Sequence, residues 1–469
     1  MKTPAFHRAP LRALHALLNR RDPLIPTLLI VAAFFALGLC RLAIPSKMMF
    51  DEIHYIPAAR RLIDLTRRLN PEHPLLGKEG IAIGIRLFGD HSFGWRFPNL
   101  VLGSVGLFAG ARAMWWASGS RRASLIFAFL IATDFIWFIL SRIAMLDMAM
   151  ASMLALGLWQ WALSAQPQRA DSAQAGRRGG RWHMILAGTF FGLSLGGKWN
   201  GAPLMVLPGL LFAWQRAAAL DLIVHPGIGG WRGVVRVLRS LRFAMLGRWL
   251  FATRAGPVRG VSLAEAGLWL GLWPAAVYLV TFAPAFFYHV QPMTLGGLFA
   301  WQRYMLQLQD SVVKPHRYMS RWWQWILNLR PIWFLYERID GSQRGVLMIG
   351  NPFSMIAGLP ALAWCAWKGW RGEGLPALIV VLYGLSLIFW AINGKPVQFY
   401  YHYELAACFL MAALALMLGR WWDAGLRWPG RTALVLTMVV FIGFYPIISA
   451  GPLPGKKGYL DYMWLKTWR

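Results

Sequence analysis

The feature that most constrains this chain is a series of apolar runs that recur along nearly its whole length. Many of them are about 20 residues long, which is the length of helix that crosses the hydrocarbon layer of a bilayer. A soluble protein of 469 residues does not usually carry such runs. With 57% hydrophobic and only 14% charged residues, the chain is predicted to be an all-α integral membrane protein, a polytopic helical bundle of about 11 transmembrane helices.

The spans are placed from the apolar runs, with ends set to within a few residues. They lie near 24–44, 97–117, 122–140, 143–164, 183–197, 200–216, 263–285, 346–367, 375–393, 402–419 and 432–450. The basic N-terminus followed by the first run is interpreted as a retained span rather than a signal peptide, because the run is long and no small-residue cleavage site follows it.

The basic residues give the spans an orientation. Lys and Arg outnumber Asp and Glu by 48 to 19, for a net charge of +29. They gather in short segments between apolar runs, as the positive-inside rule describes for cytoplasmic loops. This distribution argues against nucleic acid as a partner and places the N-terminus in the cytoplasm. The basic segment 217–262 is predicted to form an amphipathic helix on the inner membrane surface.

Two substantial loops, 45–96 and 286–345, then lie on the outer face and hold most of the acidic residues. Loops on a rigid scaffold are where catalytic and binding residues concentrate, so the chemistry is expected to face outward. The three cysteines lie in apolar runs without metal-ligand or disulfide spacing, and no metal site is expected. No internal repeat and no Walker A pattern is found, which weakens the case for a duplicated or ATP-driven transporter.

Two adjacent carboxylates, Asp51 and Glu52, precede a predicted interfacial helix over 53–69. One interpretation is structural, because a helix N-terminus favours negative charge and Asp is a good N-cap residue. The other is functional, because ionisable groups at membrane depth are costly and usually have a role. The scarcity of acidic residues in this chain favours a functional role.

Other charged residues lie at the outward turns between spans. Arg96 begins the second span, Arg142 and Asp147 flank a second turn, and Lys198 lies at a third. Arg142 and Asp147 are open to a structural interpretation, as an intramembrane ion pair that orients helices. Lys198 is open to another, in which its side chain snorkels to the head groups.

Several motifs in order resemble the signature of the dolichyl-phosphate-mannose protein mannosyltransferases. They are "FDE", "HPLLGK", "WRFP", "SRIAMLD" and "KWNG", followed by "HRYMSRWWQWILNLRPIWF", "GNP" and "YYHYELA". The resemblance spans roughly residues 45–410 and implies an eleven-span glycosyltransferase of the GT-C class. The usual His-Pro-Pro-Leu is His73-Pro74-Leu75-Leu76 here. The loop 286–345 is too short for the β-trefoil domain of eukaryotic members, which indicates a bacterial-type member.

The resemblance implies an inverting transfer of mannose from a polyprenyl phosphate to Ser or Thr hydroxyls of exported proteins. Asp51 is expected to act as general base, and Glu52 to hold the acceptor or orient Asp51. A leaving phosphate needs cationic partners, and arginine binds phosphate through two N–H groups at once. Arg96 is therefore the main candidate ligand of the donor phosphate. The weaker candidates for that phosphate are Lys198, Arg142 and His402.

Supporting roles are expected for a further set, with Asp147 holding a basic partner: Asp147, His73, Lys78, His316 and Ser320. The Trp-rich stretch 318–334 is consistent with sugar or lipid stacking, although an aromatic belt at the interface explains it as well.

The implied partners are a polyprenyl-phosphate-mannose donor, a protein or peptide acceptor, membrane lipids and the secretion translocon. No nucleotide sugar, cofactor or metal is expected. The implied location is the bacterial plasma membrane, with the active site on its outer, periplasmic face. Two other functions stay open: sugar transfer to lipid A or a glycan, as in the related aminoarabinose transferases, and flipping or transport of a lipid-linked sugar.

Overall fold

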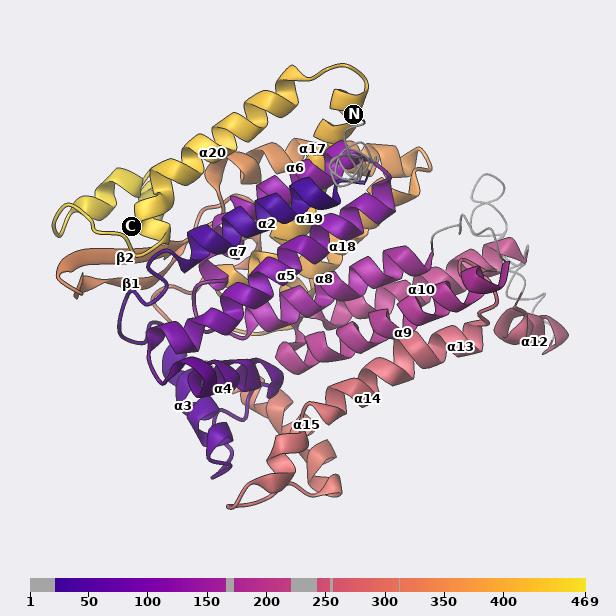
Figure 1. The fold of residues 1–469 in the computed structure, drawn as a ribbon, viewed down its shortest axis with the longest axis horizontal. Helices are drawn as coiled ribbons and strands as arrows, with labels where there is room; N and C mark the ends of the chain where they lie inside the picture. The colour runs from indigo at the N-terminus through magenta and orange to yellow at the C-terminus, as the bar shows by residue number, and fades with distance from the viewer. Residues whose placement is uncertain (1–21, 166–172, 221–242, 254–255, 312) are drawn as a thin grey trace, which may run out of the picture.

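The computed structural model describes residues 22–165, 173–220, 243–253, 256–311 and 313–469. Its long helices lie side by side, and shorter elements gather at the two ends of this bundle (Figure 1). The long helices are α2 (Leu24–Leu39), α5 (Ser92–Ser118), α6 (Arg121–Ala132), α8 (Asp147–Ser164), α9 (Ala173–Gly197), α10 (Ala202–Ala219), α17 (Pro352–Trp370), α18 (Gly374–Ile392), α19 (Glu404–Asp423) and α20 (Trp428–Ile448). A composite helix is formed by α13 (Leu263–Gly267), the π-helical turn η3 (Leu268–Leu272) and α14 (Trp273–Val280).

Helix is found at the position of each span predicted from the sequence. Within the described residues, five helical segments are both long and apolar enough to cross a membrane. They are Ser92–Ser118, Leu263–Phe287, Gly374–Ile392, Tyr400–Asp423 and Trp428–Ile448, and Leu24–Leu39 is a shorter apolar helix. The chain is therefore a mostly helical, membrane-embedded multi-pass protein.

Helix α19 lies at the centre of the bundle, where it packs against α6, α17 and α18. Its apolar residues are buried along nearly its whole length, whereas α20 keeps many apolar side chains on the outside. A helix that is apolar on all sides is suited to a buried position, and one with an exposed apolar face is suited to lipid.

The third predicted span is divided into two helices, α6 and α7 (Phe135–Leu140). Asp134 causes the second helix to begin, because its Oδ1 accepts a 2.9 Å hydrogen bond from the backbone N–H of Trp137. Asp134 is thus an N-cap in the interior of the bundle.

One end of the bundle carries the short helices α3 (Glu52–Ile63), α4 (Leu76–Phe88), α15 (Leu295–Asp310) and α16 (Trp322–Ile326). The helix predicted over 53–69 ends six residues early, because Leu65 adopts a positive φ of 47° that no α-helix contains. This end contains the N-terminus of α8 and the N-terminus of α19.

A β-hairpin of β1 (Ile332–Ile339) and β2 (Ser342–Met348) lies at the same end and corrects the all-α prediction. Its strands are rich in Ile, Trp, Phe, Tyr and Val, which favour extended backbone. The turn residues Asp340 and Gly341 have φ of 49° and 76°, as the tight turn of a twisted hairpin requires. The span predicted at 346–367 therefore begins later, at Pro352.

The opposite end carries α12 (Phe243–Phe251), which belongs to the basic segment 217–262. The part of that segment over 221–242 and 254–255 lies outside the described residues.

Candidate active site

The acidic pair Asp51–Glu52 lies where α3 begins, and its two carboxylates have different surroundings. Glu52 and Arg96 form an ion pair whose side chains are both fully buried, with two N–H···O bonds of 2.8 Å. The same carboxylate accepts backbone N–H bonds of 2.9 Å from Met49 and from Ala144. Both oxygens of Glu52 are therefore occupied by groups of the protein.

Arg96 is saturated in the same way. It donates to the backbone carbonyls of Pro45 at 2.7 Å, Lys47 at 2.9 Å and Leu42 at 3.3 Å, in addition to Glu52. A guanidinium has five N–H donors, and these contacts occupy them inside a closed shell. The Glu52–Arg96 pair joins the loop after α2, the start of α3 and α5, and this arrangement favours a structural role over the phosphate-binding role suggested by the sequence.

Asp51 occupies the N-cap position of α3, but its side chain does not cap the helix. Its one hydrogen bond within the described residues is a long one, 3.5 Å from the Tyr55 hydroxyl. The side chain is half-buried, and burial raises the pKa of Asp51 to about 6, against the opposing effect of Lys198. Asp51 is thus the member of the pair that is available to a ligand, and the capping interpretation is not supported by the geometry.

A second buried ion pair faces Asp51 from the bundle. Lys198 Nζ lies 2.8 and 2.9 Å from the two carboxylate oxygens of Asp147, and the two side chains are 5% and 1% exposed. Asp147 is the first residue of α8, where the helix dipole favours a negative charge. The Lys198 ammonium also lies 4.8 Å from the ring centroid of Tyr401. An ammonium has three N–H donors, so one remains beyond the two given to Asp147.

Arg142 does not pair with Asp147, which corrects the ion pair considered from the sequence. Its guanidinium donates to backbone carbonyls at the end of α2, including Gly38 at 2.8 Å and Cys40 at 2.7 Å, and to Ser449 at 3.3 Å. The carbonyls at the end of a helix lack partners within the helix, and the planar guanidinium of arginine is able to donate hydrogen bonds to several of them at once. Arg142 therefore fastens α2 to the end of α20.

Lys395 is a residue of this region that the sequence analysis missed. Its Nζ donates a 2.7 Å hydrogen bond to Gln309 Oε1, and Gln309 Nε2 donates to the carbonyl of Glu72 at 3.0 Å. Burial lowers the pKa of Lys395 to about 8, while Asp51 and Asp147 oppose that shift. In the sequence, Lys395 is a lone lysine in the short turn after α18, and this position by itself does not indicate a role.

His73 and Lys78 belong to the segment 70–78, which packs against α3 near the acidic pair. The His73 ring meets the Tyr55 ring edge-on at 5.8 Å, and burial keeps its pKa well below the usual value. Lys78 donates to the carbonyl of His73 at 3.0 Å and to that of Asn70, and burial lowers the pKa of Lys78 to about 7. Both residues therefore shape the 70–78 loop.

His402 lies in the 3-10 turn η5 (Tyr400–Tyr403) and is stacked on Trp390, with the ring centroids 3.8 Å apart. Its Nδ1 accepts the backbone N–H of Phe399 at 3.1 Å. These contacts make it a packing residue of the turn that carries Tyr401.

His316 and Ser320 come from the Trp-rich stretch. The His316 ring meets Phe399 edge-on at 5.1 Å, and the Ser320 hydroxyl accepts the indole N–H of Trp325 at 2.8 Å. Trp325 itself is fully buried against His402 and Trp390. Trp325 is therefore part of the packed interior beside His402, whereas Trp323 of the same helix is 45% exposed.

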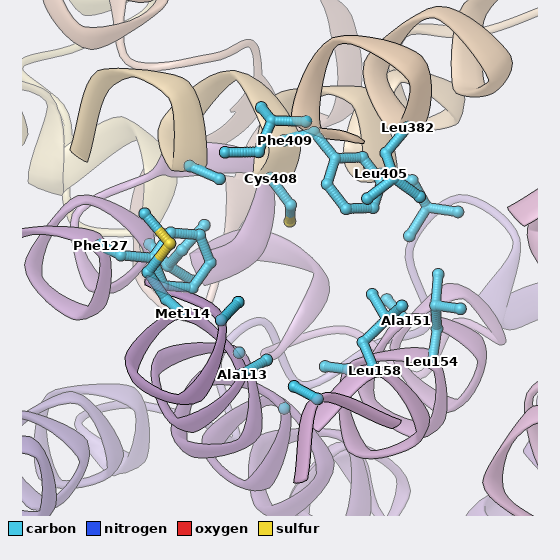
Figure 2. Close-up of a pocket in the computed structure, with 18 of the residues that line it drawn as sticks. Ala113, Met114, Phe127, Ala151, Leu154, Leu158, Leu382, Leu405, Cys408 and Phe409 are labelled. Atoms are coloured by element: carbon cyan, nitrogen blue, oxygen red, sulfur yellow. The ribbon is translucent and has the colours of Figure 1, made fainter. Parts of the chain in front are cut away.

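An apolar pocket with a volume of about 130 Å³ lies between helices of the bundle (Figure 2). Its labelled side chains come from α5, α6, α8, α18 and α19 and point toward a common space. It starts one turn beyond Asp147 on α8, at Ala151, and one residue beyond Glu404 on α19, at Leu405. Its lining extends to Ala162, near the end of α8, and to Ala412, near the middle of α19. Along α8 the lining therefore covers about three turns of helix and starts one turn from Asp147.

The polar site and the pocket suit a molecule with an anionic head and a long apolar tail. The free carboxylate of Asp51 faces two ammonium groups, Lys198 and Lys395, which are positioned to interact with a negative charge. Such an arrangement is able to hold a lipid phosphate and to accept a proton beside it.

Comparisons with known proteins bear on the family and the fold of this chain. The profile of the dolichyl-phosphate-mannose-protein mannosyltransferases matches residues 89–226, and that of the C-terminal four-span region of protein-O-mannosyltransferases matches residues 294–371. The polyprenol-phosphate-mannose–protein mannosyltransferase of Mycolicibacterium smegmatis is 27% identical, over 90% of this chain and 87% of the relative. The Corynebacterium glutamicum protein of the same name is 25% identical, over 94% of this chain and 92% of the relative.

The fold is that of a solved member of the same group. The structure of the Saccharomyces cerevisiae protein O-mannosyltransferase Pmt1-Pmt2 complex bound to the sugar donor superposes with a TM-score of 0.71. The superposition covers 94% of this chain and 92% of that one at 13% identity, so it speaks for the fold alone. Two profiles matched in order and relatives matched over nearly their full length lead to one conclusion: this chain is similar along most of its length to the dolichyl/polyprenyl-phosphate-mannose protein O-mannosyltransferases.

Proposed function

We propose that this protein is an inverting glycosyltransferase that moves mannose from a polyprenyl-phosphate donor to Ser or Thr hydroxyls of exported proteins. The observation that carries the proposal is the contrast within the acidic pair. Glu52 is closed off by Arg96 and two backbone N–H groups, whereas Asp51 is free and faces Lys198 and Lys395 above an apolar pocket.

In the proposed reaction, the acceptor hydroxyl oxygen attacks C1 of the sugar as Asp51 takes the hydroxyl proton. The bond between C1 and the phosphate oxygen breaks, and the polyprenyl phosphate leaves with the electron pair. A single displacement inverts the anomeric carbon, so a β-linked donor yields an α-linked product. A base with a pKa near neutrality suits this step, because it is both ionised and able to accept a proton.

Lys198 and Lys395 are the proposed partners of the leaving phosphate. Each keeps N–H donors beyond those given to its protein partner, and each carries a positive charge that acts on Asp51. Charge on the leaving phosphate grows in the transition state, so cations already in place accelerate the step. Arg96 and Arg142, whose donors are used by the protein, are assigned the structural roles described above.

The apolar pocket between α8, α18 and α19 is the proposed seat of the polyprenyl tail. Its lining on α8 begins one turn beyond Asp147 and includes Leu, Ala, Phe and Met side chains. A tail in this pocket would hold the donor phosphate at the level of Lys198. Burial of an isoprenoid chain contributes roughly 25 cal/mol for each Å² removed from contact with polar solvent.

The finer arrangement in the membrane belongs to the same proposal. The chain forms one GT-C transmembrane domain over 1–469 with eleven spans, an N-terminus in the cytoplasm, and catalytic loops 45–96 and 286–345 on the outer face of the bacterial plasma membrane. Acceptors then reach the site as they emerge, which makes the secretion translocon a candidate neighbour. The reaction as proposed needs no cofactor or metal.

The test is transfer of labelled mannose by the purified full-length protein in lipid nanodiscs. Polyprenyl-phosphate-mannose is supplied with Ser/Thr-rich peptides, with lipid A and with glycan acceptors in separate arms, with and without EDTA. Label in the peptide, unchanged by EDTA, is the expected result. Label that enters lipid A alone would contradict the protein acceptor, and loss of transfer with EDTA would contradict the metal-free step.

A further inference from the structure

Glu404 is a buried carboxylate that no proposed step uses. It is the first residue of α19 and is 2% exposed. Among the residues that the structure describes, neither of its oxygens has a hydrogen-bond partner. Buried polar groups in folded proteins are nearly always paired, because leaving one unpaired costs its full desolvation free energy. An unpaired carboxylate at this depth therefore indicates a ligand.

The position at a helix N-terminus does not account for Glu404. A carboxylate there gains from the helix dipole and often accepts a backbone N–H of the first turn. No described N–H of the first turn of α19 donates to Glu404. The helix supplies a favourable field but leaves both oxygens open.

The carboxylate lies at the junction between the polar site and the apolar pocket. It interacts electrostatically with Asp147 and Lys198, the pair proposed to receive the donor phosphate. The next residue, Leu405, lines the top of the pocket, and Tyr401, one turn before, lies under the Lys198 ammonium. A ligand at Glu404 is therefore adjacent to the phosphate and above the tail.

The chemistry of Glu404 selects one part of a lipid-linked sugar. The phosphate is an anion that a carboxylate repels, and the tail offers no hydrogen-bond donor. The sugar is neutral and carries several O–H donors next to the phosphate. A carboxylate has two oxygens in one plane and is able to accept two hydroxyl groups of a sugar at once.

We propose that Glu404 forms a subsite for the transferred sugar, accepting hydrogen bonds from hydroxyl groups of the polyprenyl-phosphate-linked sugar. This inference rests on the proposed function, since it assumes a lipid-linked sugar donor, but it does not depend on the acceptor. Hydrogen bonds formed out of water, to a group that has no competing protein partner, are among the stronger ones. Glu404 thereby distinguishes the sugar-loaded donor from the spent polyprenyl phosphate.

The test compares the affinity of the full-length protein in nanodiscs for polyprenyl-phosphate-mannose with its affinity for polyprenyl phosphate. The ratio of the two dissociation constants measures what the sugar contributes. In the wild type the sugar-loaded lipid is expected to bind about 10- to 100-fold more tightly. In Glu404→Ala the ratio is expected to fall to about one, with the affinity for polyprenyl phosphate unchanged within about twofold.

Two further variants keep the test decisive. Glu404→Gln keeps the volume and one acceptor oxygen, so it is expected to fold and to lose only part of the ratio, about three- to tenfold. Asp134→Asn is the matched control, because Asp134 is also a buried acid with one unpaired oxygen but caps α7 instead. Its ratio is expected to equal that of the wild type.

The inference is overturned if Glu404→Gln keeps the wild-type ratio, if it weakens both lipids equally, or if the wild-type ratio is itself one. Failure of the proposed function is a separate result. If the wild type prefers another sugar-phosphate lipid over the mannosyl one, the mannosyl donor is wrong, and the Glu404 ratio is measured with the preferred lipid instead.

Discussion

The molecule contains two buried ion pairs at the same end of its bundle, and they differ in what they leave open. In the Glu52–Arg96 pair, every carboxylate oxygen and the guanidinium donors meet a protein group. In the Asp147–Lys198 pair, the ammonium keeps a donor beside Tyr401, and Asp51 and Glu404 lie close enough to interact. We interpret the Glu52–Arg96 pair as a structural link, here called the brace, and the Asp147–Lys198 pair as part of the proposed binding site. Burial alone does not separate the two roles, whereas counting the remaining donors and acceptors does.

The largest expected effect comes from Asp51, which belongs to the open side of this comparison. Asp51→Asn is expected to lower kcat about 10²- to 10⁴-fold, because an amide cannot accept the hydroxyl proton. The thermal midpoint should stay close to that of the wild type, since the side chain makes one long hydrogen bond. The measurement is initial-rate mannosyl transfer together with a thermal unfolding curve. Asp64→Asn, at the exposed far end of α3, is the matched control and should keep full activity.

Substitutions in the Glu52–Arg96 pair are expected to lower the stability of the protein rather than its kcat. Arg96→Ala leaves the buried Glu52 carboxylate without its cation, which is expected to cost about 3–5 kcal/mol of folding free energy. The measurement is unfolding in detergent. The double variant Arg96→Met with Glu52→Gln removes both charges and should recover much of the loss. A folded Arg96→Ala protein of normal stability that fails only to bind polyprenyl phosphate would restore the phosphate-binding role to Arg96.

Substitutions in the Asp147–Lys198 pair are expected to weaken the affinity of the protein for the lipid donor. Lys198→Met is expected to raise the KM for the lipid donor about 10- to 100-fold, because a charge-assisted contact to phosphate is lost. Asp147 would then lack its partner, so the comparison is made in an Asp147→Asn background that leaves no unpaired charge. Kinetics at several donor concentrations separate KM from kcat. A donor KM that is the same with and without Lys198 would remove it from the phosphate site.

The pH profile sharpens the comparison further, because burial raises the pKa of Asp51, on the open side, to about 6. Below about pH 6 the Asp51 carboxyl is protonated and cannot act as a base, so kcat/KM should rise through about pH 6. Lys395 loses its proton near pH 8, so kcat/KM should fall above that value. The raised pKa of Asp51 also has a stability consequence. Its ionisation is disfavoured in the fold, so stability should decrease as the pH rises from about 4 to about 6.

Two variants assign the limbs of that profile. Lys395→Met should remove the falling limb while the rising limb stays. The residual activity of Asp51→Asn should show no rising limb near pH 6. A profile that rises in both Asp51→Asn and wild type would place the titrating base elsewhere.

The smallest effect on stability is expected for Asp340, which holds the loop that contacts Arg96. Asp340, at the hairpin turn, accepts the backbone N–H of Ser46 at 2.9 Å and its hydroxyl at 2.6 Å. The neighbouring carbonyls of Pro45 and Lys47 accept from Arg96. Asp340→Ala is therefore expected to cost about 1 kcal/mol of stability, because the contacts are exposed. Thermal unfolding measures it, and Asp461→Ala, an exposed acid elsewhere, is the control.

The sequence was sufficient to locate the helices, but it did not show which charged residues have structural roles and which have functional ones. Asp51 and Glu52 are neighbours in a scarce acidic set, so the sequence singled them out as candidate site residues. The roles of Arg96 and Lys198 could not be assigned in the same way. Each is a cation at an outward turn, and only the count of partners in the fold distinguishes them. Glu404 and Lys395 were missed because a lone charge in a membrane-edge motif carries no signal of its own.

What the sequence determined by itself is the class of the protein, because apolar runs of bilayer length leave the backbone no structure but helix. It also determined the order of the family motifs, the first of which places Asp51 just after the first span. The tertiary structure decided which groups are satisfied. Glu52 and Arg96, 44 residues apart, close on each other, and Asp147 and Lys198, 51 apart, do not close fully. Hydrogen-bond saturation is a property of three-dimensional neighbours, and no spacing along the chain encodes it.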